Sequence, residues 1–187
     1  MKKAILLLFI LFAAAGPLFS IESRRDYFLK PQIGLWFGPV TPIGSTGKAL
    51  DANLGGGIFF RYNLPWRYFK VGFDAGYEFF KQNDGVNKMH FMPFYGNVLF
   101  LLPIPIPLKF QLKAGAGAGW LHIQPDKKNR WDPIFVFGGE VSFPAGRFVN
   151  IGLRTDYIFI YEQYLKGAVY NGHVLNIGIA VYFNLNL

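Results

Sequence analysis

Few residues in this chain have the side chains that catalysis or metal binding requires. The sequence contains no cysteine, which excludes disulfides and thiolate metal sites. Its three histidines are His90, His122 and His173, and a fold that brought them together could form a three-histidine zinc site. No carboxylate stands at clear ligand spacing from any of them, so we expect neither a metal nor a cofactor.

The charged residues are more informative, because they recur at alternate positions. Between residues 69 and 80 the odd positions are Phe, Val, Phe, Ala, Tyr and Phe, whereas Lys70, Asp74 and Glu78 fall on even positions. A β-strand sends successive side chains to opposite faces. This segment therefore predicts a strand with one apolar face and one face of charges and glycine. The same design recurs at 108–120, 149–161 and 175–184.

Four more segments follow the alternation less regularly, at 29–39, 52–62, 89–101 and 133–143. In 89–101 both faces are apolar, and we assign Met92, Phe94, Val98 and Phe100 to the outer face. In 133–143, Ile134 and Val136 share the face that carries Glu140. The eight predicted strands are longer than the five to six residues usual in soluble proteins and suit the crossing of a bilayer, which takes about nine to eleven.

The connections between these strands alternate in character. The segments 63–68, 103–107 and 144–147 are short and each contains proline, whereas 40–51, 81–88, 121–132 and 162–171 are longer and polar. Short turns at one end and long loops at the other are typical of bacterial outer-membrane barrels. We therefore predict an all-β fold, an eight-stranded antiparallel up-and-down transmembrane barrel that leaves no unpaired edge in lipid.

Several runs resemble the small eight-stranded bacterial outer-membrane β-barrel family, of the OmpA transmembrane-domain and OmpX type. They are GGGIFFRY at 55–62, MPFY at 92–95, GLR at 152–154 and the aromatic pair YF at 182–183. The resemblance covers about residue 29 to the end of the chain. It implies a monomer inserted by the outer-membrane assembly machinery, although the sequence ends on Asn-Leu-Asn-Leu where many such barrels end on an aromatic residue. Because the sequence shows no peptidoglycan-binding segment after the last predicted strand, we do not expect that role of the larger family members here.

The inward face of the predicted barrel collects charges of both signs. Because an eight-stranded barrel is just wide enough to be filled by side chains, we expect these residues to form a plug of ion pairs, since charges cannot stay buried alone. The alternative is a narrow path for ions or small solutes. The predicted network consists of Arg61, Lys70, Asp74, Glu78, Lys109, Lys113, Glu140, Arg154 and Asp156.

Surface contacts are expected from the third long loop and from aromatic residues at strand ends. The loop candidates are Lys127, Lys128, Arg130 and Trp131, which could touch anionic lipopolysaccharide or a host surface. Tyr62, Trp66, Tyr68 and Phe69 cluster at the first short turn, and Phe143 and Phe148 flank the third, as in an interfacial girdle. Outer-membrane lipid is the expected partner, and nucleic acid is not, despite the net charge of +8.

The N-terminal segment has the pattern of a secretory signal peptide. Lys2 and Lys3 precede an apolar run at 4–15 that ends at Gly16 and Pro17, with cleavage expected after Ser20 or earlier after Ala15. That run is shorter than the ~20 residues that span a bilayer. We predict a signal peptide at 1–20, a short periplasmic segment at 21–28 and the barrel at 29–187, in the outer membrane.

Two other interpretations remain to be weighed. Some outer-membrane barrels are lipid A deacylases or acyltransferases with a Ser or His nucleophile system, but Ser23, Ser45 and Ser142 show no His-x-Ser-Asn pattern, so we expect no enzymatic activity. The tripeptides at 34–36 and 155–157 match short lipocalin motifs. Lipocalins, however, place apolar residues inside the barrel, whereas here the charges share the glycine-rich face.

Overall fold

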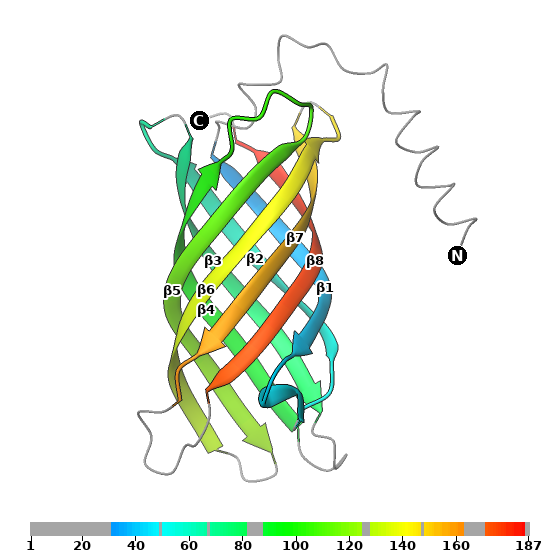
Figure 1. The fold of residues 1–187 in the computed structure, drawn as a ribbon, viewed down its shortest axis with the longest axis vertical. Helices are drawn as coiled ribbons and strands as arrows, with labels where there is room; N and C mark the ends of the chain where they lie inside the picture. The colour runs from blue at the N-terminus through cyan, green and yellow to red at the C-terminus, as the bar shows by residue number, and fades with distance from the viewer. Residues whose placement is uncertain are drawn as a thin grey trace, which may run out of the picture.

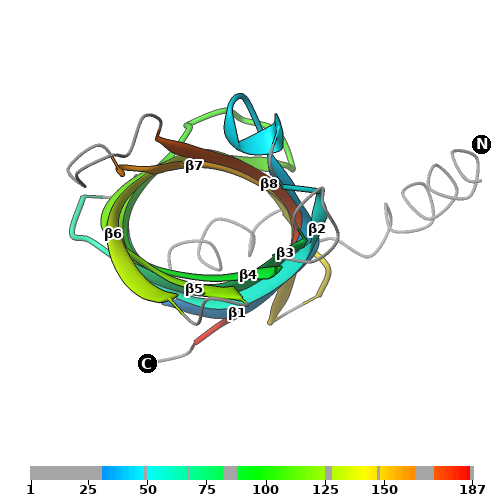
Figure 2. The same cartoon turned by 90° about the horizontal axis from the view of Figure 1, so that it is seen from below.

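The computed structural model describes residues 31–48, 50–66, 68–81, 88–124, 128–146, 148–162 and 171–185. These residues form a closed barrel of eight antiparallel strands, each hydrogen-bonded to its neighbours in sequence, with the first strand closing on the last (Figures 1 and 2). The strands are β1 (Gln32–Pro42), β2 (Asn53–Asn63), β3 (Phe69–Lys81), β4 (Lys88–Leu101), β5 (Lys109–Gln124), β6 (Lys128–Pro144), β7 (Val149–Ile160) and β8 (Gly172–Asn184). The predicted fold class is confirmed.

The two ends of the barrel differ in their connections. We call the end that carries residues 64–68, 102–108 and 145–148 the turn end, and the opposite end the loop end. Segment 43–52 at the loop end contains the short helix η2 (Thr46–Lys48). β1 starts and β8 finishes at the turn end, where Gln32 pairs in register with Asn184.

The alternation read from the sequence is present in the strands. Apolar side chains at odd positions of β3, β7 and β8 and at even positions of β2 and β5 face outward. Leu35, Leu153 and Ile179 on the outer wall are 59% to 62% exposed, whereas Arg61 and Asp156 on the inner wall are 1% exposed. The outward assignment of Met92, Phe94, Val98 and Phe100 in β4 is also confirmed, because Phe91, Tyr95 and Leu99 between them are buried. The interior polarity is therefore opposite to that of a lipocalin.

Glycines on the inner wall make room for large inward side chains. A Cβ atom added at Gly57 would lie 2.6 Å from Nε1 of Trp36, and one added at Gly138 would lie 2.1 Å from Oδ1 of Asp156. The interior of an eight-stranded barrel is narrow, so a bulky residue on one strand requires a small one on the wall opposite or beside it. The many inward glycines are thus explained by packing against the residues that fill the barrel.

The hairpin of β5 and β6 corrects one prediction. Residues 121–132 were expected to form a long loop, but β5 continues to Gln124 and β6 begins at Lys128. His122 pairs in register with Asn129, and Trp120 pairs with Trp131. The polar residues of this segment still alternate between the two walls, so they extend the hairpin beyond the apolar band. β6 is accordingly the longest strand, with 17 residues.

Across the described ranges, no helix is both long enough and apolar enough to cross a bilayer. The predicted signal peptide at 1–20 and the predicted periplasmic segment at 21–28 lie outside the described residues.

Candidate functional site

The inner wall of the barrel holds an ion pair between β2 and β6. Arg61 donates to both carboxylate oxygens of Glu140, with Nη1 to Oε1 at 3.1 Å and Nη2 to Oε2 at 2.6 Å. Both side chains are almost fully buried. The guanidinium carbon of Arg61 also lies 4.2 Å from the ring centre of Phe59, a cation–π distance. This bidentate geometry is the strong form of an arginine–carboxylate contact.

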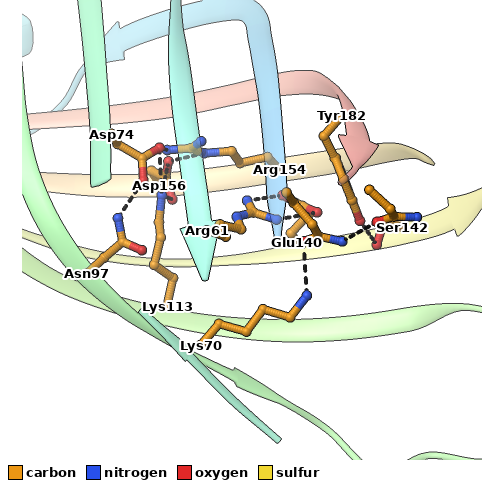
Figure 3. Close-up of polar contacts among 12 residues, drawn as sticks. Arg61, Lys70, Asp74, Asn97, Lys113, Glu140, Ser142, Arg154, Asp156 and Tyr182 are labelled. Atoms are coloured by element: carbon orange, nitrogen blue, oxygen red, sulfur yellow. Dashed lines mark hydrogen bonds and ion pairs between the residues drawn. The ribbon is translucent and has the colours of Figure 1, made fainter. Parts of the chain in front are cut away.

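A second charge cluster brings Asp74, Lys113, Arg154 and Asp156 together inside the barrel (Figure 3). Arg154 on β7 pairs with both Asp74 on β3 and Asp156 on its own strand. Lys113 on β5 lies 2.7 Å from Asp156 and 3.9 Å from Asp74. The hydroxyl of Tyr95 accepts hydrogen bonds from Lys113 at 3.1 Å and from Arg154 at 2.7 Å. Charges distant in sequence are thereby linked across the barrel.

The remaining predicted network residues are held by amide side chains or lie at the edge. Lys70 donates to Oε1 of Gln32 at 2.9 Å, and Gln32 in turn donates to Asn184. Glu78 accepts from the Asn176 amide at 2.7 Å. Lys109 is half-buried at the start of β5. The other eight of the nine predicted residues are buried. Lys70 and Glu78, however, belong to neither of the two ion-pair groups.

Polar residues that charge patterns alone do not reveal complete this interior. Asn97 donates its amide to Asp74, and the Tyr182 hydroxyl donates to Oγ of Ser142 at 2.7 Å. Gln32 and Asn176, the partners of Lys70 and Glu78, are amides, and so is Asn184, which accepts from Gln32. Their inward parity was readable in the sequence, and the search for charged residues overlooked them.

Towards the loop end the interior contains a buried apolar cluster, so the predicted ion-pair network fills only part of the barrel. We call the following buried cluster the apolar plug; it lies between the charge cluster and the loop end. Phe91 and Val136 in it have no exposed surface. Its members are Val40, Phe80, Phe91, Leu121, Ile134, Val136, Ile158, Ile160 and Val174.

The residues predicted as surface-loop contacts have different positions. Arg130 lies on β6 and pairs with Asp132 at 2.7 Å and with Glu162 at 3.0 Å, so it joins β6 to the segment after β7 at the rim. Burial raises the pKa of Glu162, while Arg130 opposes this shift. Trp131 lies on the outer wall, 58% exposed, with its ring 6.0 Å from that of Phe94. Lys128 begins β6, and Lys127 is outside the described residues.

The three histidines lie on the outer wall near the loop end. His90 and His122 are register partners on β4 and β5, with ring centres 5.9 Å apart. His173 is on β8, where its Nδ1 contacts the Tyr157 hydroxyl at 2.6 Å. Within the described ranges, no group of three histidine or acidic side chains is arranged to hold a metal ion. Ser142 lies inside the barrel, fully buried, and Ser23 is outside the described residues.

Solved structures with similar folds are small outer-membrane barrels. Neisserial surface protein A aligns with a TM-score of 0.65 at 12% identity, covering 83% of this chain and 97% of its own. The N-terminal β-barrel domain of Pseudomonas aeruginosa OprF aligns at 0.55 and 12%, covering 84% and 98%. The outer-membrane enzyme PagL aligns at 0.52 and 15%, covering 83% and 99%. No protein-family model and no curated protein sequence matches the chain.

At these identities the likeness concerns the fold alone. The chain has the fold of small eight-stranded outer-membrane β-barrels, as its sequence pattern predicted. The similar structures include a surface protein and an enzyme, so the fold does not select a function.

Proposed function

We propose that the chain is an integral protein of a bacterial outer membrane, a monomeric and non-enzymatic barrel with a structural or surface-interaction role. The single observation that carries this proposal is the reversal of polarity between the walls. Side chains such as Leu35, Phe137 and Ile179 are 56% to 62% exposed around the outside, while basic and acidic side chains such as Arg61, Arg154 and Asp156 are buried inside. A soluble protein rarely exposes a continuous apolar band of this kind, whereas lipid requires it.

Aromatic residues at the turn end support a membrane position. Trp66 is 72% exposed, and Tyr62, Tyr68 and Phe69 beside it are also exposed. The rings of Trp66 and Phe69 meet edge to face at 6.3 Å. Amphipathic aromatic rings are enriched at the level of lipid head groups, on both sides of a membrane. We infer that this cluster marks one interface and that the loop end faces the exterior.

The filled interior favours a structural or surface role over solute transport. Two groups of side chains follow one another along the barrel, the charge cluster first and the apolar plug towards the loop end. An ion that followed the charged residues would meet buried Phe80, Phe91 and Leu121 before the loop end. We infer that the segment 1–20 directs export and that the assembly machinery inserts the barrel, with lipopolysaccharide or a host surface as contacts at its loop end.

Heat-modifiable migration tests the membrane barrel. Protein extracted from outer membranes and loaded without boiling should migrate faster than boiled protein, because a closed barrel binds less detergent than an unfolded chain. Resistance to alkaline carbonate extraction should accompany the shift. Protein that is soluble without detergent, or that shows no shift, would overturn the proposal.

An acyl-chain assay tests the non-enzymatic part of the proposal. Lipopolysaccharide incubated with the folded protein in detergent should keep its acyl chains, as judged by mass spectrometry against a protein-free control. A change in acyl composition that depends on the folded protein would instead establish the lipid-modifying alternative.

A further inference from the structure

Four basic side chains gather on the outer wall at the loop end. We call Lys81, Lys88, His90 and His122 the basic patch. Lys81 on β3 and Lys88 on β4 are register partners, and His90 and His122 form the register pair between β4 and β5. The lysines are exposed, and the histidine rings are 5.9 Å apart. All four have outward parity, so they share one surface.

This arrangement places like charges directly opposite each other. A pair of like charges at facing positions of an antiparallel sheet is destabilising. Neither lysine forms an ion pair with a described carboxylate. Asp51 donates its backbone N–H to the carbonyl of Lys81 at 2.8 Å, but its carboxylate does not pair with the lysine ammonium. An anion bound by both lysine ammonium groups would relieve the repulsion between them.

Aromatic rings adjoin the basic patch on the side of the apolar band, and we call Tyr77, Phe79 and Trp120 the aromatic shelf. The Tyr77 hydroxyl contacts Nδ1 of His90 at 2.6 Å, and Phe79 packs against the same ring at 5.1 Å. Trp120 stacks on His122 with an interplanar angle of 8°. In the tautomer whose Nδ1 accepts from Tyr77, the Nε2 atom of His90 carries the proton and can donate to an anion. Apolar, aromatic and basic layers thus follow one another towards the loop end.

The same layering describes a lipid with an anionic head group. Acyl chains would lie along the apolar band, the aromatic shelf would sit at the interface, and the lysine stems would extend along it to reach phosphate. Resting on the proposed membrane insertion, we propose that the basic patch binds the phosphate group of an anionic lipid in the leaflet at the loop end.

The opposite wall provides an internal contrast. On β7 and β8, Tyr157 contacts His173 at 2.6 Å and Phe159 packs on the same ring at 5.4 Å. The same tyrosine–histidine contact adjoins the basic patch, but the described register of β7 with β8 contains no facing lysines. The tyrosine–histidine pair therefore belongs to the aromatic girdle in general, and the lysine pair distinguishes the proposed lipid site.

Isothermal titration of the folded barrel in zwitterionic detergent tests the proposal. The probes are lipid A with two phosphates, lipid A with the same acyl chains and no phosphate, and inorganic phosphate alone. The wild type should bind only the phosphorylated lipid. The variant Lys81→Gln/Lys88→Gln should bind it about tenfold more weakly or worse, because both ammonium groups that attract the phosphate are removed. Lys81→Arg/Lys88→Arg should retain binding.

Two controls separate the patch from general charge and from aromatic contacts. Lys48→Gln removes a positive charge on η2 at the same end of the barrel, and His173→Gln alters the wall formed by β7 and β8; both should bind like the wild type. Equal binding of the two lipids, or unchanged binding by Lys81→Gln/Lys88→Gln, would overturn the proposal. Binding of inorganic phosphate at comparable strength would replace the lipid with a free anion.

Heat-modifiable migration of every variant distinguishes this proposal from the proposed function. If the wild type does not form a heat-modifiable membrane barrel, the proposed function fails. If it does, and the folded glutamine variant still binds lipid A normally, only the lipid site fails. Both lysines are exposed at strand ends, so their replacement should leave the barrel intact, and the arginine variant provides a folded reference.

Discussion

The pair of Arg61 and Glu140 is the most directly testable contact in the interior. Glu140 receives both terminal nitrogens of Arg61 and is buried with it. Replacing Glu140 by alanine leaves a buried guanidinium without its counter-charge, and we expect the free energy of unfolding to fall by about 3–5 kcal/mol. Urea unfolding of the folded barrel in lipid measures this loss, and unchanged urea resistance would contradict an interior network.

A double variant separates the cost of a lone charge from the value of the pair. Arg61→Met/Glu140→Met removes both charges and keeps apolar volume, and replacement of a whole buried ion pair is often neutral or stabilising. We therefore expect the double variant to be more stable than Glu140→Ala in the same urea assay. Equal destabilisation would mean that packing, rather than charge, dominates at this position.

Gly138 tests the role of glycine on the inner wall. An added Cβ would stand 2.1 Å from Oδ1 of Asp156 and 2.5 Å from the Thr155 carbonyl oxygen, so Gly138→Ala must push Asp156 away from its basic partners. We expect a loss of about 1–3 kcal/mol in unfolding free energy, as for other overpacked interiors. Gly146→Ala is the control, since nothing lies within 4 Å of its added Cβ; similar losses in both would argue against the packing explanation.

At the level of the strands, the sequence predicts the pattern well because apolar and polar residues alternate wherever one wall of the barrel is apolar and the other is not. β4 was harder, since its inner wall carries Phe91 and Leu99 as well as Asn97. The interior charges were predictable from the same parity. The contacts that these charges make were less predictable. Which strand faces Arg154 across the barrel depends on how the sheet closes, and an uncharged amide such as Gln32 is not found by a search for charged residues.

The extended β5–β6 hairpin was missed for a physical reason. Its outer part is polar, and polar residues without apolar alternation resemble a loop. In the barrel, Asp132 faces inward and pairs with Arg130 while Trp131 faces outward. The side chains therefore still alternate between the two walls, although the inward ones are polar. The hairpin rises above the apolar band and is held by backbone pairing and by the rim ion pairs.

Hydrogen exchange tests this hairpin. Backbone amides of β6 residues 129–132 that pair with β5 should exchange slowly in the folded barrel, because they are in a continuous ladder. Arg130→Ala removes the contacts to Asp132 and Glu162 and should speed exchange there while leaving amides of the mid-barrel ladder, such as that of Val141, unchanged. Fast exchange of 129–132 in the wild type would restore the long loop that the sequence predicted.

In the molecule as a whole, side chains of different polarity fill successive levels of the barrel, with charged residues at one level and apolar residues at the next. The apolar plug accounts for apolar residues, such as Phe80 and Ile134, that face neither lipid nor water. We expect the wild-type barrel to show no resolved single-channel steps in a planar bilayer. Phe80→Ala/Phe91→Ala should introduce measurable conductance, whereas the outward variant Phe73→Ala should not. Steady conductance by the wild type would favour the solute-path alternative.

The central claim is that the outer wall of this barrel faces lipid on every side. The chain contains no cysteine, so single cysteines at Leu35, Phe137, Leu153 and Ile179, and at the loop-end residue Lys48, can each carry a nitroxide label in bilayers. We predict that the four wall labels collide readily with oxygen and poorly with a water-soluble nickel complex, and that the Lys48 label shows the reverse. Wall labels that are accessible to the nickel complex would show that this surface faces water instead of lipid.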